Sequence, residues 1–335
     1  MADFITLGIE SSCDETSVAV VINGNKIGSN IISSQLELHA RFGGVVPEIA
    51  ARCHLESILP VYRLALEQAG INIGAVNLIA VTYGPGLVGC LLVGLAFAKG
   101  LALARKLPII GVNHVEGHIY ANILERPQIQ PPLLCLTVSG GHTDLLLMER
   151  WGKYRVLGRT RDDAAGEAFD KIARVLGLPY PGGPAIDKIA QGVTGDLNFA
   201  QMKRLNDSYD FSFSGLKTAV INYVNHERQL NREMDIPRIA ASFQKMAVEQ
   251  LVEKLFQAAA DFQVDNILLS GGVAANTYLR ARCHQEAARY GKQLYYPDLR
   301  LCTDNAAMIG ATGYYRYLAG GASELSLTAQ PDLRL

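Results

Sequence analysis

The arrangement of apolar and polar positions occurs twice along the chain. In the first half, a strand-like run at residues 5–10 is followed by a small polar turn and a second run at 17–22. In the middle, the run 133–138, a glycine-containing turn and the run 145–148 follow in the same order. Short strand-like runs on both sides of small or glycine residues are typical of β-hairpins. The pattern therefore predicts one such hairpin in each half.

The later part of each half also follows one order, which is strand, turn, helix, strand. The predicted elements are a strand at 77–82, a helix at 87–105 and a strand at 108–112 in the first half, and a strand at 265–269, a helix at 274–290 and a strand at 293–296 in the second. Each final strand leads toward residues that can bind a metal: His114 and His118 in the first half and Asp304 in the second. The repeat predicts a duplicated α/β protein with two lobes around a central cleft.

The composition agrees with two well-packed lobes. The chain has 335 residues, of which 49% are hydrophobic and 19% charged, and this length is too great for one typical core. The formal net charge of -1 provides no overall basic surface for nucleic acid. A nucleic-acid substrate would therefore need a local basic patch or a partner subunit.

Cysteine usage and hydropathy favour a cytoplasmic protein that does not cross a membrane. None of the six cysteines forms a C-x-x-C pair, and several lie in apolar runs, as is typical of buried thiols in a reducing compartment. Residues 78–98 carry no charge, which by itself would fit a membrane span. The sequence Tyr83-Gly84-Pro85-Gly86 interrupts that stretch, so we expect a strand, a turn and a helix there instead.

Two histidines four residues apart form the first candidate site. On a helix, His114 and His118 share one face, where two imidazoles can hold one ion. Two similar lobes packed about a pseudo-twofold axis would place Asp304 opposite them across the cleft. Two histidines and one carboxylate leave open coordination positions and suit Fe²⁺ or Zn²⁺. The alternative is that the histidines cap a helix or face the solvent.

Glycine-rich turns form the second candidate site. The turns at 139–141 and 270–272 occupy corresponding places, and exposed backbone N–H groups in such turns bind anions, which favours a nucleotide-like ligand. No G-x-x-x-x-G-K-[ST] motif is present, so this is not a P-loop protein. Asp170 and Asp187 lie near glycine-rich backbone and could bind ribose hydroxyls, or they could mark a helix start and a tight turn. The aromatic and hydroxyl residues at 211–217 could stack on nucleic acid or form a structural loop.

Taken together, these residues resemble one family, the tRNA adenosine threonylcarbamoyltransferases. The resemblance extends from about residue 5 to about residue 317. It rests on several motifs in the same order: ESSCDET at 10–16, FGGVVPE at 42–48, HVEGH at 114–118, VSGGH at 138–142, GEAFDK at 166–171, PGGPAID at 181–187, SGGVAAN at 270–276 and CTDN at 302–305.

This resemblance implies a fold, a reaction and partners. The fold would be that of the actin-like, sugar-kinase and Hsp70-type ATPases. The reaction would transfer the threonylcarbamoyl group from threonylcarbamoyl-AMP to N6 of the adenosine just 3′ of the anticodon, in tRNAs reading ANN codons, giving t6A and AMP. The partners would be a smaller subunit of the same fold and a separate P-loop ATPase. The expected domains are residues 1–130, residues 131–320 with a helical insertion at about 160–250, and a tail at 321–335.

The resemblance also implies roles for individual residues. His114, His118 and Asp304 would be the metal ligands, with iron as the usual metal. The adenylate pocket would be lined by Val138, Ser139, Gly140, Gly141, His142, Asp170, Gly183, Asp187 and Asn276.

The acceptor amine is a weak nucleophile because its lone pair is delocalised into the purine, so catalysis depends on positioning and charge stabilisation. Asp14 or Glu15, at the tip of the first hairpin, could accept the N6 proton or fix the acceptor. The alternative is a turn that only shapes the cleft.

Other classes of protein fit the sequence less well. A zinc metalloprotease needs H-E-x-x-H, but Val115 follows the first histidine here. A sugar kinase or ATPase of this fold would use Mg²⁺ without a histidine pair. A non-catalytic scaffold would not need intact metal ligands.

Overall fold

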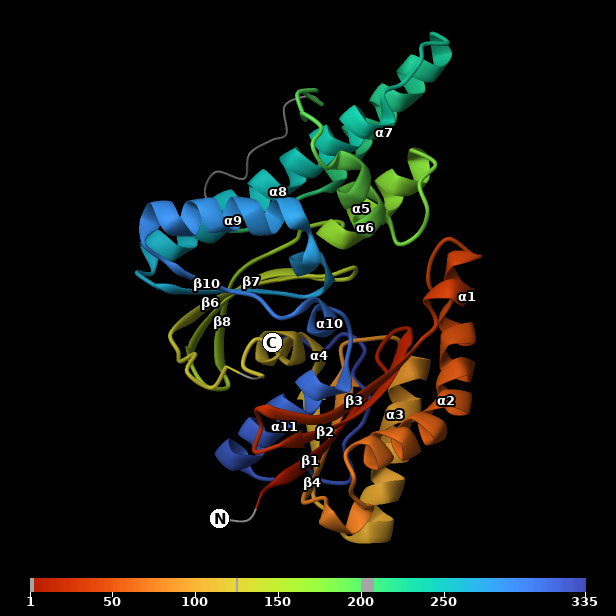
Figure 1. Cartoon of the computed structure of the whole chain (residues 1–335), viewed down its shortest axis with the longest axis vertical. Coiled ribbons are helices and arrows are strands. Elements are labelled where there is room, and N and C mark those ends of the chain that lie inside the picture. Colours follow the sequence, from red (N-terminus) through yellow and green to blue (C-terminus); the bar gives the residue numbers. More distant parts are fainter. Residues whose placement is uncertain (1–2, 125, 200–207) are drawn as a thin grey trace. The chain divides into compact units, whose positions relative to one another are not determined.

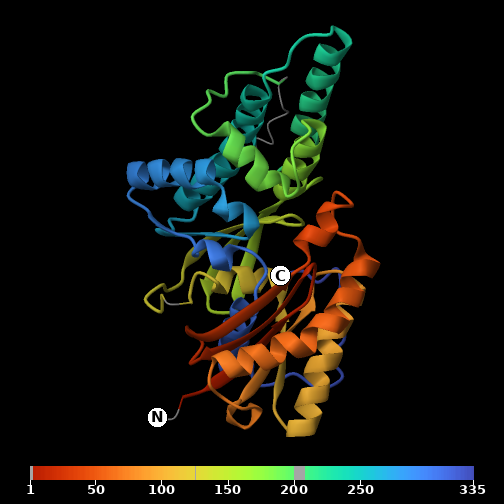
Figure 2. The same ribbon diagram turned by 45° about the vertical axis from the view of Figure 1, so that its right-hand side comes forward.

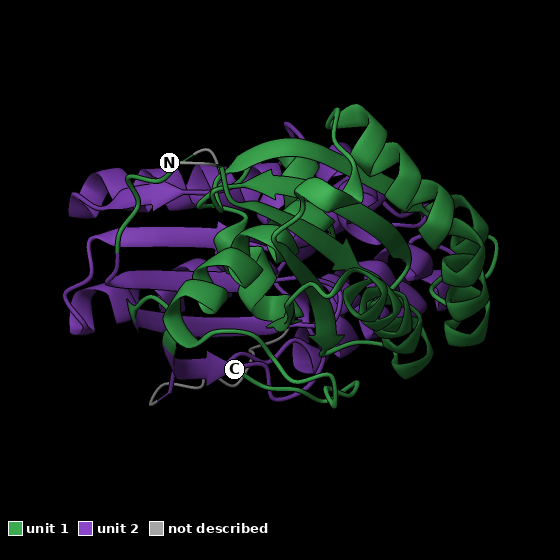
Figure 3. Cartoon of the chain, turned by 90° about the horizontal axis from the view of Figure 1, so that it is seen from below, with its two compact units in different colours: residues 1–130, 150–153, 297–335 green, residues 131–149, 154–296 purple. Residues whose placement is uncertain are grey.

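The computed structural model describes residues 3–124, 126–199 and 208–335. The chain divides into two compact units, which Figure 3 distinguishes by colour. Unit 1 comprises Met1–Gln130, Arg150–Lys153 and Pro297–Leu335, and unit 2 comprises Pro131–Glu149 and Tyr154–Tyr296. The expected boundary at residue 130 agrees with this division. The expected extension of the second lobe to residue 320 is wrong, because residues 297–320 belong to unit 1, as does the tail.

Each unit contains a five-stranded sheet with the same strand order. The sheet of unit 1 has the order β3-β2-β1-β4-β5, with β1 at Ile5–Glu10, β2 at Glu15–Ile22, β3 at Lys26–Ser34, β4 at Leu78–Gly84 and β5 at Ile109–Asn113. The sheet of unit 2 has the order β8-β7-β6-β9-β10, with β6 at Leu133–Val138, β7 at Thr143–Arg150, β8 at Lys153–Arg159, β9 at Asn266–Ser270 and β10 at Gln293–Tyr295. The predicted duplication is confirmed.

Pairing directions are also the same in the two sheets. In unit 1, β1 pairs antiparallel with β2 and parallel with β4. In unit 2, β6 pairs antiparallel with β7 and parallel with β9. Parallel pairs need a long crossover, and in unit 1 the chain between β4 and β5 forms one helix.

The central strand β1 is buried on both faces, which is why its sequence reads as a continuous apolar run. Leu7 and Ile9 face the hydrophobic core that lies beneath two long helices. Gly8 faces the opposite way, where a Cβ would lie 2.1 Å from the backbone oxygen of Ala306. A glycine at this position therefore lets the last helix of the chain approach the sheet closely.

The helices of unit 1 cover both faces of its sheet. They are α1 at Leu36–Ala40, α2 at Pro47–Gln68, α3 at Val88–Arg105, α4 at His114–Tyr120, α10 at Leu299–Cys302 and α11 at Ala306–Gly320, with a 3₁₀ turn at Ile73–Ala75. Helices α2 and α3 lie side by side on one face, and α11 lies on the other (Figures 1 and 2). By length and composition alone, α3 could cross a membrane. It packs against β4 and α2, as an apolar helix of a core also does.

Unit 2 contains the expected helical insertion. Its helices are α5 at Ala165–Val175, α6 at Gly182–Ala190, α7 at Ser214–Gln229, α8 at Ile236–Asp261 and α9 at Thr277–Tyr290, with a 3₁₀ turn at Gly272–Ala275. Their apolar faces share one core with β6 and β7. Residues 200–207, which fall inside the expected insertion, lie outside the described residues.

The C-terminal segment returns to unit 1 because its contacts are there. Helix α11 packs on β1 and β4. Beyond it, the N–H of Ser323 donates to the carbonyl of Ile109 at 2.8 Å, and the N–H of Gln330 donates to the carbonyl of Tyr83 at 2.7 Å. The tail that the repeat did not include is thus hydrogen-bonded to the ends of β4 and β5.

Candidate functional site

The two histidines lie at the start of α4, directly after β5. Asn113 ends the strand, and its side-chain oxygen accepts hydrogen bonds from the N–H groups of Val115 and Glu116 at 2.9 and 3.2 Å. This cap begins a helix at His114, so that His118 follows about one turn later on the same face. Both histidines are buried, at 6% and 1% exposure.

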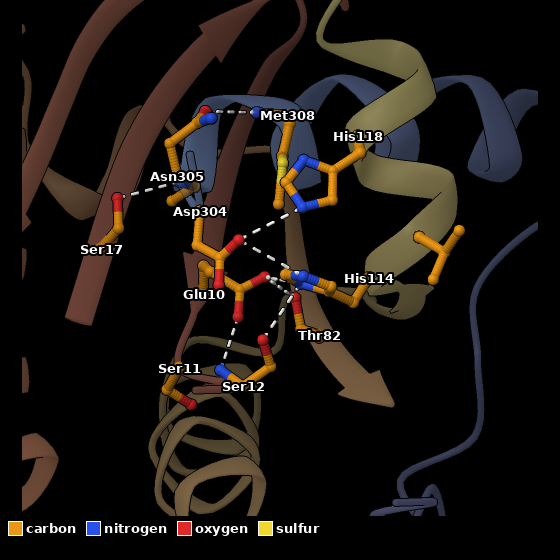
Figure 4. A network of polar contacts seen from close by, with 12 residues as sticks. Glu10, Ser11, Ser12, Ser17, Thr82, His114, His118, Asp304, Asn305 and Met308 are labelled. Atoms are coloured by element: carbon orange, nitrogen blue, oxygen red, sulfur yellow. Dashed lines mark hydrogen bonds and ion pairs between the residues drawn. The ribbon is translucent and has the colours of Figure 1, made fainter. Parts of the chain in front are cut away.

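Asp304 reaches the histidines from the segment before α11. Asn305 caps this helix by accepting a hydrogen bond from the N–H of Met308 at 3.0 Å. One carboxylate oxygen of Asp304 lies 3.4 Å from Nε2 of His114 and 3.2 Å from Nε2 of His118 (Figure 4). The structure therefore brings the three predicted ligands together, with their ligand atoms within 4.8 Å of one another.

The reason for this convergence differs from the one expected. The sequence analysis joined Asp304 to the histidines across two lobes. In the structure all three side chains belong to unit 1, because residues 297–335 return to it. The cluster is therefore built within one unit, by β5, α4 and the segment that precedes α11.

A fourth residue, Glu10, fixes the orientation of His114. Its carboxylate accepts hydrogen bonds from Nδ1 of His114 at 3.0 Å, from the hydroxyl of Thr82 at 2.7 Å and from the N–H of Ser12 at 2.6 Å (Figure 4). Because a carboxylate only accepts, Nδ1 of His114 carries a proton, which leaves Nε2, the nitrogen beside Asp304, as the atom that would bind a metal. A histidine that binds a metal is commonly oriented by a carboxylate in this way.

His118 provides the observation that tests whether a metal fits. Both of its ring nitrogens are buried, and within the described residues neither makes a hydrogen bond. Buried polar atoms are normally satisfied, so an orphaned imidazole indicates a missing partner. Its Nε2 and that of His114 lie beside the same oxygen of Asp304, as expected for three donors that share one cation. The residues present fit a divalent metal.

The charges of the cluster are strongly coupled. Burial opposes ionisation of Asp304, but the neighbouring imidazoles of His114 and His118 hold the pKa of its carboxyl well below the usual range. Burial opposes protonation of His114, but the carboxylates of Asp304 and Glu10 raise its pKa well above the ordinary value. A buried pair of carboxylates around histidines creates a negative local potential that attracts a cation.

The candidate catalytic carboxylates lie where the chain passes from β1 into β2. We call residues 11–16, which follow the last residue of β1 and precede the first β1–β2 pair, the first turn; Asp14 precedes β2 and Glu15 is its first residue. Asp14 is buried, and the hydroxyl of Ser34 donates to Oε1 of Glu15 at 3.2 Å. Burial raises the pKa of Glu15 to about 9, together with the negative charges of Asp304 and Asp14. The hydroxyl oxygen of Ser12, in the same turn, lies 3.0 Å from Nδ1 of His114, so the first turn adjoins the metal cluster of unit 1.

Sequence reasoning missed Glu10, Thr82 and Ser12 as parts of this cluster. One signal was available for the first of them. Glu10 is the last residue of a buried apolar strand, where an unpaired carboxylate would be very costly. A carboxylate at such a position indicates a polar partner beyond the strand end. No comparable signal distinguished Thr82 or Ser12.

In unit 2, the turn between β6 and β7, which we call the second turn (residues 139–142), is closed by its own hydrogen bonds and accepts one from outside, from the N–H of Gly166 to the carbonyl of Ser139 at 3.2 Å. The N–H of Ser139 donates to the carbonyl of His142 at 2.8 Å, and the N–H of His142 donates to the hydroxyl of Ser139 at 3.1 Å. An added Cβ at Gly140 or Gly141 would meet nothing within 4 Å. The backbone of these glycines is therefore open to a ligand.

Two further glycines let other backbone segments reach the second turn. A Cβ on Gly166, at the start of α5, would lie 2.5 Å from the carbonyl oxygen of Ser139. Gly271 has a φ of +83°, and a Cβ there would lie 2.4 Å from the carbonyl oxygen of Val138. The structure thus brings the predicted motifs at 138–142, 166–171 and 270–276 together in unit 2.

The predicted ribose ligands serve as helix caps in the structure. Asp170 accepts a hydrogen bond from the N–H of Gly182 at 2.7 Å, at the start of α6. Both carboxylate oxygens of Asp187 accept from Thr277, at 3.0 Å from its N–H and 2.8 Å from its hydroxyl. Asn276 accepts from the N–H of Leu279 at 2.8 Å and so caps α9.

These contacts correspond to the alternative left open for the two aspartates, a helix start and a tight turn. The remaining predicted pocket residue, Gly183, would meet nothing within 4 Å if it carried a Cβ.

Comparisons with known proteins agree with the fold and the motifs. A family model described as tRNA N6-adenosine threonylcarbamoyltransferase matches residues 26–311. A relative of that name in Clostridium perfringens is 52% identical over 99% of this chain and 98% of its own length. Another, in Clostridioides difficile, is 52% identical over 100% of this chain and 99% of its own.

The solved structure of HypF from T. kodakarensis is similar with a TM-score of 0.64 and 14% identity, over 97% of this chain and 49% of that one. At that identity the likeness concerns the fold alone. The predicted actin-like, sugar-kinase and Hsp70-type fold is confirmed.

Proposed function

Because the chain belongs to the tRNA N6-adenosine threonylcarbamoyltransferase family, we propose that it transfers the threonylcarbamoyl group of threonylcarbamoyl-AMP to N6 of the adenosine just 3′ of the anticodon, in tRNAs reading ANN codons. The observation that carries this conclusion is the trio of His114, His118 and Asp304, with both histidines buried and Asp304 partly buried, which lies inside the matched region. Neither a small-molecule kinase of this fold nor a zincin protease accounts for such a trio.

We propose that His114, His118 and Asp304 hold a divalent metal, Fe²⁺ or Zn²⁺. The buried Nδ1 and Nε2 of His118, which make no hydrogen bond within the described residues, and the orientation of His114 by Glu10 support this assignment. Three protein ligands leave coordination positions open. A bound cation would polarise the carbonyl of the threonylcarbamoyl group as a Lewis acid. Glu10 keeps His114 in the tautomer that binding requires.

The transfer needs a group that accepts one proton. N6 forms a bond to the carbamoyl carbon, the bond from that carbon to the phosphate oxygen breaks, and AMP leaves with the electron pair. The N6 proton then passes to a carboxylate, and Asp14 and Glu15 are the candidates. Glu15, whose pKa is raised to about 9, keeps its own proton at neutral pH while no cation is bound. This favours Asp14 as the acceptor.

We propose that unit 2 binds the adenylate through backbone. The open glycines Gly140 and Gly141 offer N–H groups to the phosphate, and Gly183 leaves room beside α6. Val138, Ser139 and His142 frame the same turn. Asp170, Asp187 and Asn276 hold the helix starts around it, and their remaining lone pairs face any hydroxyl bound there.

We propose that the protein works in the cytoplasm with two protein partners, a smaller subunit of the same fold and a P-loop ATPase, and with tRNA, and that it is not anchored in a membrane. Six free cysteines support a reducing compartment. The near-zero net charge supports a partner that helps to bind tRNA. Leu55 and Leu59 of α2 and Leu92 of α3 are exposed, which is typical of a protein-contact surface.

The experiment measures t6A formation on unmodified tRNA. Synthetic threonylcarbamoyl-AMP, the partner subunits and Fe²⁺ are supplied, and the wild type is compared with His114→Ala. His226→Ala, which removes an exposed histidine of α7, is the matched control. We expect product from the wild type and the control and none from His114→Ala. Absence of product from the wild type would overturn the transferase proposal, and full activity of His114→Ala would overturn the metal assignment.

A further inference from the structure

The first turn is held from outside by three different elements. Three consecutive carbonyl groups each accept one hydrogen bond: that of Ser12 from the N–H of Leu87 at 2.8 Å, that of Cys13 from Nε2 of His54 at 3.0 Å, and that of Asp14 from the N–H of Gln35 at 3.1 Å. Leu87 precedes α3, His54 lies on α2 and Gln35 precedes α1. Of these three donors, His54 alone is a side chain.

The ring of His54 contacts the residues on either side of Asp14 and Glu15, the candidate catalytic carboxylates. A carbonyl oxygen only accepts, so Nε2 of His54 carries the proton that is donated to Cys13. Nδ1 is then unprotonated and accepts the hydroxyl proton of Thr16 at 2.7 Å. Cys13 and Thr16 are the residues immediately before and after Asp14 and Glu15. One imidazole therefore binds both residues that flank the two carboxylates in the sequence.

The position of this ring is well determined. His54 is fully buried, on the side of α2 that faces the sheet. Burial lowers its pKa, against the opposing effects of the Cys13 carbonyl and of the carboxylates Glu10 and Asp14. The neutral ring can therefore keep both contacts at neutral pH. Both ring nitrogens are used within the protein, which leaves none for a ligand.

Taking the transferase function proposed above as the premise, we propose that His54 is a positioning residue for it. Its two hydrogen bonds hold the backbone carbonyl of Cys13 and the side-chain hydroxyl of Thr16, on either side of Asp14 and Glu15, and so fix where the two carboxylates stand relative to the acceptor amine. A displacement of about 1 Å in such a group is enough to reduce a rate by about 100-fold. His54 acts through the turn and does not touch the reacting atoms.

A purely structural role would have a different signature. Any buried histidine that loses its hydrogen bonds destabilises a fold. Ser29→Ala is the control, because Ser29 is also buried in unit 1 and also makes two hydrogen bonds. Its hydroxyl donates to the carbonyl of Ala65 at 2.7 Å and accepts from the N–H of Val20 at 3.3 Å. Neither partner is a residue of the first turn or one of its three donors.

The first test compares His54→Ala, His54→Gln and Ser29→Ala in the t6A assay, with partners and metal present and at a temperature well below the lowest Tm. We expect His54→Ala to lower kcat by about 10–100-fold, as removal of a supporting residue typically does, with the KM for threonylcarbamoyl-AMP within about twofold of the wild type. His54→Gln, whose amide can donate to the Cys13 carbonyl, should recover part of the loss. Ser29→Ala should lower Tm, because it removes two buried hydrogen bonds, but change kcat by less than about threefold.

The second test does not depend on activity. Amide hydrogen exchange at Asp14, Glu15 and Thr16 should become faster in His54→Ala and stay unchanged in Ser29→Ala. If exchange in the first turn is the same in the wild type and His54→Ala, the positioning role is wrong. Equal losses of kcat in His54→Ala and Ser29→Ala would also overturn it. A wild type that forms no t6A would refute the transferase function, while the exchange data would still decide whether His54 fixes the turn.

Discussion

The two hairpin turns occupy the same place in the duplicated fold but are built differently. The antiparallel ladder ends at the pair Glu10–Ser17 in unit 1 and at the pair Val138–Thr143 in unit 2, which leaves six residues in the first turn and four in the second. The first turn carries Asp14 and Glu15, whereas the second carries two adjacent glycines. One place in the topology has thus acquired side-chain chemistry in one unit and an exposed backbone in the other.

The means of support also differ. Donors from three other elements hold the first turn, whereas the second is closed by hydrogen bonds between Ser139 and His142 and receives one donor from outside, the N–H of Gly166, 3.2 Å from the carbonyl oxygen of Ser139. A turn that presents charged side chains must resist their repulsion and the cost of burying them, so it needs more support from outside. A turn that presents backbone needs open space and glycines. The same place in the topology can therefore present carboxylates in one unit and backbone N–H groups in the other.

The largest expected effect is the loss of the carboxylates in the first turn. Asp14→Ala should lower kcat for t6A formation by about 10²–10⁴-fold because it removes the carboxylate proposed to accept the N6 proton, and Glu15→Ala should lower kcat less. Glu67→Ala, which removes an exposed carboxylate at the end of α2, is the control and should keep wild-type activity. Full activity in both turn variants would reduce the first turn to a structural role and remove the functional contrast with the second.

The next effect concerns Glu10, which links the first turn to the metal cluster. Glu10→Gln keeps the size of the side chain but removes the charge that stabilises the Nδ1–H tautomer of His114. We expect metal affinity to fall by about 10–100-fold, measured by competition with a chelator. Ser139→Ala changes the corresponding hairpin of unit 2 and should leave metal affinity unchanged. An unchanged affinity in Glu10→Gln would show that His114 does not need this partner.

A smaller effect distinguishes the two kinds of glycine at the second turn. Gly166→Ala places a Cβ 2.5 Å from the carbonyl oxygen of Ser139, whereas Gly140→Ala meets nothing within 4 Å. The first change should reduce the free energy of unfolding by about 1–3 kcal/mol, as overpacking usually does. The second should change it by less than about 0.5 kcal/mol, as measured by urea denaturation. Equal losses would mean that the second turn is not open.

The central strands β1 and β6 were predicted to the residue. Of the edge strands, β5 and β10 were predicted, but β3 and β8 were not. The runs at 5–10 and 133–138 are the bounds of β1 and β6, because strands buried on both faces read as apolar runs between turns. Strands β3 and β8 lie at sheet edges, where polar and apolar residues mix without a clear period. A sequence alone gives little signal for strands of that kind.

The candidate site shows a similar limit. The type and spacing of His114 and His118 carried enough information to propose them as ligands. The return of residues 297–335 to unit 1 depends on packing between α11 and β1, which no local pattern encodes. The sequence analysis therefore found Asp304 but placed it in the wrong lobe. The support of the first turn by His54 was not found, because the contact joins residues from two distant elements.

The smallest expected effect is a pH dependence of the free energy of unfolding, which the first turn should cause and the second should not. Glu15 has an ordinary pKa of 4.5, and burial, Asp304 and Asp14 raise it to about 9 in the folded protein without metal. Between these values the folded state binds more protons than the unfolded state, so its stability decreases as pH rises. The contribution of protonated Glu15 is complete below the lower value and is lost as pH passes the higher one.

Urea unfolding of chelator-treated protein at about pH 6 and about pH 9 tests this dependence. The wild type should lose more stability across that range than Glu15→Gln, whereas Ser139→Ala, in the second turn, should follow the wild type. If the wild type and Glu15→Gln keep a constant difference, the pKa of Glu15 is not raised. Added Fe²⁺ should reduce the slope, because a cation beside Asp304 offsets the negative charge that keeps Glu15 protonated. That result would show that the charges of the first turn and of the metal cluster are coupled. The second turn carries no carboxylate that could take part in such a coupling.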